Sequence, residues 1–173
     1  MAVLDIIEAP DRRLTTKSAP IEGIDADFLR LLDNMLETMY AAPGIGLAAP
    51  QIGILQRTFV VDLGNEGERA PLFVINPEIL ARSETTNVGE EGCLSLPKQF
   101  GEVARFDQIR MRYLDRDARI QEIEADGLLA RCLQHEIDHL DGILFVDHLS
   151  PLKRTMILRR LAKAKRARER ESA

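Results

Sequence analysis

Apolar residues recur at helical spacing in two separate parts of the chain. From Asp25 to Met39 they lie three and four residues apart, as on one face of a helix that packs on a core. Asp25 is suited to cap this helix, and Pro43-Gly44 follows where it should stop. The same spacing returns from Gly127 to Leu140. We therefore predict a helix over each segment.

Between about residues 57 and 123 the pattern is typical of strands separated by turn-rich joints, which favours antiparallel hairpins. A last helix should begin after Ser150, with Pro151 at its first position. The order helix, strands, helix, helix indicates an α+β fold, with antiparallel sheets packed around the helix of residues 127–140 and a C-terminal helix. The expected strands are 58–62, 72–75, 79–85 and 109–114.

The length of 173 residues and a hydrophobic content of 45% suit one globular domain. We expect residues 1–150 to form its body and residues 151–173 a C-terminal helix or tail of the same domain. Two cysteines are too few for a disulfide framework, which favours a reducing compartment. The sequence shows neither a charged leader followed by a long apolar run nor an apolar stretch of membrane-spanning length. We therefore expect a cytoplasmic protein with no membrane partner.

Charge is unevenly distributed along the chain, whose formal net charge is −5. Residues 153–173 contain nine Lys or Arg against two Glu, which gives the tail +7 and leaves −12 on the rest. Such a tail suggests an anionic partner such as RNA, although a solvated charged helix that frays from about Ala164 explains it equally well. Its apolar stripe, Leu152, Met156 and Leu161, is incomplete.

A run of small residues from Gly44 to Gly53 allows another backbone to approach closely. It lacks the Lys-Ser/Thr pair of a phosphate-binding loop and the glycine spacing of a dinucleotide turn. We therefore expect no nucleotide cofactor. Among partners, we also expect no specific DNA.

The sequence His135-Glu136-Ile137-Asp138-His139 has the pattern H-E-x-x-H inside the second predicted helix. Residues four apart lie on one helical face, so both imidazoles can bind one ion while Glu136 lies beside a bound water. Such a carboxylate can accept the proton of the water and later deliver it to a leaving amine. The pattern predicts a hydrolytic metal site.

A catalytic site of this kind needs about three protein ligands and one open position. Cys132 shares the helical face, but it lies seven residues from His139, roughly 10.5 Å along the axis, so we expect it to be a buried neighbour and not a ligand. Cys93, in the strand-rich region, is one remaining candidate. The others follow the helix: Asp141, Asp147 and His148, the last most simply a surface residue.

Three segments together resemble the peptide deformylase family: residues 44–51 (GIGLAAPQ), 91–95 (EGCLS) and 134–139 (QHEIDH). The resemblance extends from about Leu4 to Leu149. It implies one divalent metal held by Cys93, His135 and His139. A thiolate with two imidazoles suits iron(II), zinc, cobalt or nickel. The family implies ferrous iron as the native metal, with the others as replacements.

The resemblance also implies a substrate and a set of contacts. The substrate would be an N-formylmethionyl nascent peptide, and formate would be released. The Gln51 side-chain amide and the Leu94 backbone N–H would stabilise the oxyanion. Residues lining the methionine pocket or binding the peptide backbone would be Gly44, Ile45, Gly46, Leu128 and Cys132, with His135 beside them.

Two other functions compete with this interpretation. One is a different H-E-x-x-H hydrolase, such as an endopeptidase, which would cleave internal peptide bonds without releasing formate. The other is a ribosome- or RNA-binding module with a structural metal, which would have four filled protein positions. A ribosomal partner, bound through the basic tail, is compatible with the deformylase interpretation as well.

Overall fold

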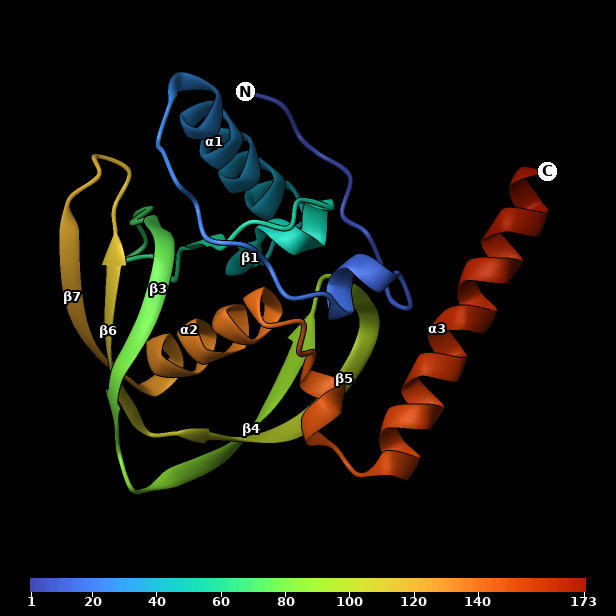
Figure 1. Ribbon diagram of the computed structural model, residues 1–173. Helices are drawn as coiled ribbons and strands as arrows, with labels where there is room; N and C mark the ends of the chain where they lie inside the picture. Colours follow the sequence, from blue (N-terminus) through green and yellow to red (C-terminus); the bar gives the residue numbers. More distant parts are fainter.

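The computed structural model describes all of residues 1–173, and it consists of two antiparallel sheets and three α-helices (Figure 1). The helices are α1 (Ala26–Ala41), α2 (Gly127–Leu140) and α3 (Pro151–Ser172). The strands are β1 (Gly46–Ala48), β2 (Thr58–Val61), β3 (Leu72–Arg82), β4 (Thr86–Cys93), β5 (Leu96–Phe106), β6 (Gln108–Leu114) and β7 (Ile120–Asp126). Short 3-10 helices occupy Arg12–Thr15 (η1), Ala49–Ile52 (η2) and Phe145–His148 (η3).

Helix α2 lies between the two sheets. The larger sheet has the order β1-β2-β3-β6-β7, and the smaller one is the β4-β5 hairpin. The apolar face of α2, including Leu133, Ile137 and Leu140, packs with Phe59 and Met111 of the larger sheet in one buried cluster. Figure 1 shows the β4-β5 hairpin below and to the right of α2, on the side away from β6 and β7. The predicted α+β class and the central position of this helix are confirmed.

All three predicted helices are present. The Asp25 side chain accepts a hydrogen bond from the backbone N–H of Phe28 at 2.8 Å, which caps α1. Helix α2 has the predicted bounds and is followed by Gly142, whose φ of 74° lies in the left-handed region that ends helices. Ser150 caps α3 through the N–H of Lys153.

The strand prediction was correct in part. Segments 72–75 and 79–85 were expected to be separate strands, yet most of this region forms the single strand β3. The Asn76-Pro77 pair, which resembles a break, falls at a register shift between Ile75 and Glu78, and a bulge of this kind lets a strand continue. The run from Gly44 to Gly53 is not only a loop, because it contains β1 and η2.

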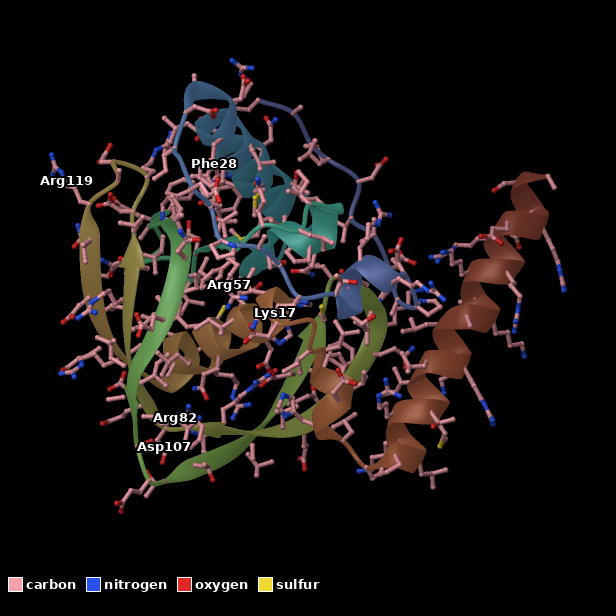
Figure 2. All side chains as sticks on the ribbon, viewed as in Figure 1. Lys17, Phe28, Arg57, Arg82, Asp107 and Arg119 are labelled. Atoms are coloured by element: carbon pink, nitrogen blue, oxygen red, sulfur yellow. The ribbon has the colours of Figure 1, made fainter.

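Helix α3 packs on the body through its N-terminal half. Ile157 and Leu161 are buried in a cluster with Phe145 and Val146, whereas Leu152 and Met156 are exposed. The predicted apolar stripe was therefore wrong at Leu152 and Met156 and correct at Leu161. The positions that pack on the body are Ile157 and Leu161, which lie four residues apart on one face of the helix. The C-terminal half of α3 is helical to Ser172, and its side chains extend mainly into solvent apart from the ion pair of Arg168 with Glu8 (Figure 2). Neither α3 nor any other helix has the length and apolar character needed to span a membrane.

Candidate metal centre

Three side chains from two separate elements meet at one end of the cavity beside α2. Cys93 ends β4, and His135 and His139 lie one turn apart on α2. Their ligand atoms all lie within 4.8 Å of one another. Cys93 Sγ is 3.3 Å from His139 Nε2, and the two Nε2 atoms are 3.2 Å apart. One sulfur and two imidazole nitrogens at this separation are a donor set suited to a divalent transition metal.

A carboxylate fixes the orientation of His135. Nδ1 of His135 lies 2.9 Å from Oε1 of Glu91, so the ring donates from Nδ1 and directs Nε2 at the cluster. Arg105 donates to both oxygens of Glu91 at 2.8 Å. Burial alone would raise the pKa of Glu91, but hydrogen bonds from Arg105 and His135 hold it well below its usual value. Glu91 is therefore a carboxylate that can hold the ring in one tautomer.

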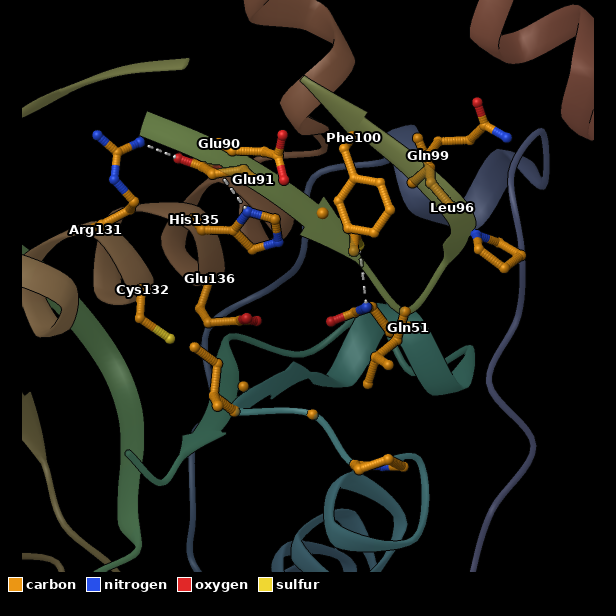
Figure 3. A pocket seen from close by; sticks show the side chains of 18 of the residues that line it. Gln51, Glu90, Glu91, Leu96, Gln99, Phe100, Arg131, Cys132, His135 and Glu136 are labelled. Atoms are coloured by element: carbon orange, nitrogen blue, oxygen red, sulfur yellow. Dashed lines mark hydrogen bonds and ion pairs between the residues drawn. The ribbon is translucent and has the colours of Figure 1, made fainter. Parts of the chain in front are cut away.

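Glu136 is buried beside the cluster, and its Oε2 has no hydrogen-bond partner in the chain. An unpartnered buried carboxylate oxygen is costly unless something bound in the cavity contacts it. Burial raises the pKa of Glu136 to about 7. The group can therefore accept and return a proton near neutral pH, and Figure 3 shows its carboxylate beside the ring of His135. These residues fit a bound metal with a water or substrate at its open position.

Gln51 and Leu94 lie next to Cys93. Gln51 is buried in η2, where its Oε1 accepts from the N–H of Ala48 at 3.0 Å. Its Nε2 donates to Ser95 Oγ at 3.2 Å and lies 3.5 Å from Cys93 Sγ. Leu94 lies in the turn between β4 and β5. Both predicted oxyanion donors are therefore adjacent to the cluster, and their role stays a prediction.

A cavity of about 570 Å³ extends from Glu136 to the surface. The residues predicted to bind substrate all line it, namely Gly44, Ile45, Gly46, Leu128 and Cys132, together with Phe100 at the rim.

The remaining candidate ligands are occupied elsewhere. Asp141 pairs with Arg57, and Asp147 pairs with Arg154. His148 is exposed, as expected, and contacts Asp138 through Nε2 at 2.8 Å.

Cys132 lies outside the ligand cluster, in the wall of the cavity. Burial raises the pKa of its thiol well above the usual value, so it is a neutral side chain and not a thiolate.

Sequence reasoning did not assign any role to Glu91, Arg105 or Arg131. Arg105 and Arg131 both contact Glu91, which in turn contacts His135. The signal that could have identified Glu91 is its position two residues before Cys93, where strand alternation places both side chains on one face.

Comparisons with known proteins agree with this geometry. The model of the family "Polypeptide deformylase" matches residues 3–155. A peptide deformylase of Alkalilimnicola ehrlichii is 58% identical over 163 residues, which are 94% of this chain and 91% of that protein. One of Rhizobium meliloti is 53% identical over 169 residues, 97% of each chain.

Solved structures show the same fold. A peptide deformylase from Ehrlichia chaffeensis in complex with actinonin superposes with a TM-score of 0.91 at 41% identity, covering 96% of this chain and 99% of that one. A Legionella pneumophila peptide deformylase gives a TM-score of 0.89 at 45% identity, covering 98% and 99%. The resemblance read from the three segments is confirmed, and the chain belongs to the polypeptide deformylase family.

Proposed function

We propose that this chain hydrolyses the N-formyl group of formylmethionyl peptides at the cluster of Cys93, His135 and His139. The observation that carries the proposal is the buried, unpartnered Glu136 beside two imidazoles and a thiol at one end of a cavity. When bound there, a divalent metal would acidify a water and polarise the formyl oxygen. The donor set and the family favour ferrous iron as the native metal, with zinc, nickel or cobalt as replacements.

The protein side chains would move the proton and stabilise charge. Glu136 would accept a proton from the attacking water and deliver it to the nitrogen of methionine as the C–N bond breaks, which yields formate and a free amine. The side-chain amide of Gln51, held by Ala48 and Ser95, and the N–H of Leu94 would donate to the formyl oxygen as it gains negative charge.

The cavity would bind the first residue through both its side chain and its backbone. The apolar parts of Ile45, Leu128 and Cys132 would surround the methionine side chain. Gly44 and Gly46 have no side chains, so an extended peptide can approach the backbone at the edge strand β1. Residues 1–150 contain every group named in this mechanism, and we assign the catalytic domain to them.

Formate release from a formyl-Met-Ala-Ser peptide tests the proposal directly. The expected result is stoichiometric formate and free N-terminal methionine, lost on metal chelation and restored by iron(II) under anaerobic conditions. A longer peptide that contains the Met-Ala-Ser sequence internally and carries no formyl group serves as the control. Internal cleavage without formate would favour the endopeptidase, and metal binding without any hydrolysis would favour a structural site. Elemental analysis after anaerobic purification would identify the metal.

We further propose that α3 holds the enzyme near the ribosome. Beyond Leu161 the helix has no buried residue, although Arg168 pairs with Glu8 at the surface of the body. The exposed half is rich in Lys and Arg, which suits a phosphate-rich surface such as ribosomal RNA.

A further inference from the structure

Arg131 lines the cavity but has no part in the reaction proposed above. It lies on α2 four residues before His135, and its side chain is only 12% exposed. Nη1 donates to Glu91 Oε2 at 2.7 Å and to the carbonyl of Val103 at 2.9 Å. Nη2 donates to Asn87, at 2.6 Å to Oδ1 and 3.0 Å to the carbonyl. All these acceptors belong to the β4-β5 hairpin, and Figure 3 shows Arg131 directed at Glu91.

These contacts matter because the proposed ligands come from two different substructures. Cys93 belongs to the β4-β5 hairpin, which pairs with no strand of the larger sheet, whereas both histidines belong to α2. The separation of Cys93 Sγ from the imidazoles therefore depends on how the hairpin is held against the helix. Arg131 joins both strands of the hairpin to α2.

The positive charge of Arg131 also balances the carboxylates around Arg105. Glu91 and Asp138 contribute two negative charges to a buried network in which Arg105 contacts both. Without Arg131, Glu91 would be paired only with Arg105, which it shares with Asp138. Arg131 contributes the second positive charge, and a buried ionic network is stable only when its charges are paired.

Gly89 of strand β4 lies directly against the guanidinium of Arg131. A Cβ atom on Gly89 would lie 3.0 Å from Cζ of Arg131 and 3.1 Å from its Nε and Nη2. The φ of Gly89 is not positive, so alanine at this position would meet no backbone strain. The guanidinium of Arg131 therefore occupies the space that a side chain at position 89 would fill.

We infer that Arg131 is a positioning residue, which fixes the β4-β5 hairpin on α2 and thereby holds Cys93 Sγ at binding distance from His135 and His139. The inference rests on the proposed metal site, but it concerns assembly of that site and not turnover.

Release of metal tests the inference without any formyl peptide. In Arg131→Met the aliphatic stem remains and every hydrogen bond is lost. We expect zinc to leave this variant about 10-fold faster on dilution into chelator, within the range seen when groups behind metal ligands are removed. In the cobalt-loaded protein, the charge-transfer band of the cobalt–sulfur bond should weaken or shift. Arg131→Lys keeps the charge and should restore part of both properties.

Arg112→Met is the matched control, because Arg112 pairs with Glu122 on the exposed face of β6 and β7. It should leave metal release and the cobalt band unchanged. If Arg131→Met gives the same release rate and band as Arg112→Met, the inference is wrong. It is also wrong if faster release occurs with an unaltered cobalt band and only in proportion to a lower unfolding temperature, since that result indicates general destabilisation.

A double-mutant cycle with Gly89 gives an independent result. Gly89→Ala should accelerate metal release by displacing the guanidinium, and it should have little further effect when Arg131 is already methionine. Additive effects in the double variant would contradict the inference. Failure of zinc or cobalt to bind the wild-type chain would refute the metal site itself, which is a distinguishable outcome.

Discussion

Glu136 occupies the space that a side chain at Gly46 would need. A Cβ atom on Gly46 would lie 2.5 Å from Oε1 of Glu136 and 3.2 Å from Sγ of Cys132. Gly46 pairs with Val61 at the edge of the larger sheet, so strand β1 and helix α2 approach closely at this position. The close approach is what allows a carboxylate on α2 to face a peptide bound along β1.

Replacing Gly46 with alanine should displace Glu136 and lower kcat about 100-fold, since displacing a catalytic group by about 1 Å has an effect of that order. Metal content should be unchanged because the atoms nearest to a Cβ at Gly46 belong to Glu136 and Cys132, neither of which is a proposed ligand. The measurement is steady-state formate release with parallel metal analysis. Gly23→Ala is the control, because a Cβ there would have no atom within 4 Å. Full activity of Gly46→Ala would show that Glu136 need not occupy this position.

Glu136→Gln should retain the metal and lose deformylation by about 10²- to 10⁴-fold, because glutamine keeps the shape but cannot accept the proton. Formate release and metal content would be measured on the same sample. Substantial remaining turnover would exclude Glu136 as the general base.

The two cysteines should respond differently to substitution. Cys93→Ser should weaken metal binding and change the preferred metal, because an alkoxyl oxygen is a harder ligand than a thiolate. Cys132→Ser should retain the metal and change at most packing or the fit of the first side chain. Equilibrium dialysis with zinc and cobalt compares them. Equal metal loss in both variants would mean that Cys132 also binds the metal.

How far the fold could be predicted depended on whether local sequence determined each element. Helices α1 and α2 were predicted from an apolar face at helical spacing, and α3 from Ser150 followed by Pro151, because each of these signals is encoded within its own segment. The β4-β5 hairpin was not resolved into strands, because its residues alternate less clearly and their partners lie across a turn.

The candidate site likewise contains residues that local sequence predicts and contacts that only the tertiary structure shows. His135, Glu136 and His139 were proposed as a unit because helical spacing places them together. The contacts of Glu91 with Arg105 and Arg131 join residues 14 and 40 positions apart, and spacing alone cannot predict such contacts. Arg131 on a helix would ordinarily be read as a solvated charge. Only the tertiary structure shows that it is almost buried.

Alkaline pH should reveal the contact of Tyr40 with Asp62. Burial and the hydrogen bond from its hydroxyl to Asp62 raise the pKa of Tyr40 to about 12, above the value of 10.0 for a free phenol. The folded state therefore favours the protonated phenol. This contribution to stability is present below pH 10 and is lost as the pH rises toward about 12.

Absorbance titration can measure this directly, because the chain has two tyrosines and no tryptophan. Tyr40→Phe should remove the transition near pH 12 from the folded protein. Tyr113→Phe should leave that transition in place and remove the one of Tyr113, whose pKa burial also raises. A single transition near pH 10 in the wild-type protein, before it unfolds, would contradict the assignment.

Shortening the basic helix α3 tests whether it holds the enzyme at the ribosome, without disturbing catalysis. Ile157 and Leu161 anchor α3 to the body, and no later residue is buried. Removing residues after Leu161 should therefore leave activity on a free formylmethionyl peptide within about twofold of wild type, since surface changes seldom alter stability by more than about 0.5 kcal/mol. The same truncation should weaken co-sedimentation with ribosomes.

Salt dependence distinguishes docking from a solvated tail. Each phosphate neutralised by Lys or Arg releases counterions, so binding of the full chain should fall steeply between about 50 and 200 mM salt. The truncated chain should bind weakly at every salt concentration. Charge reversal of Lys163, Lys165 and Arg166 to glutamate, in the full-length chain, separates the role of charge from that of length. Because these residues lie beyond Leu161, the fold should tolerate the change while ribosome binding is lost. Unchanged co-sedimentation in both variants would leave α3 as a solvated helix with no part in docking.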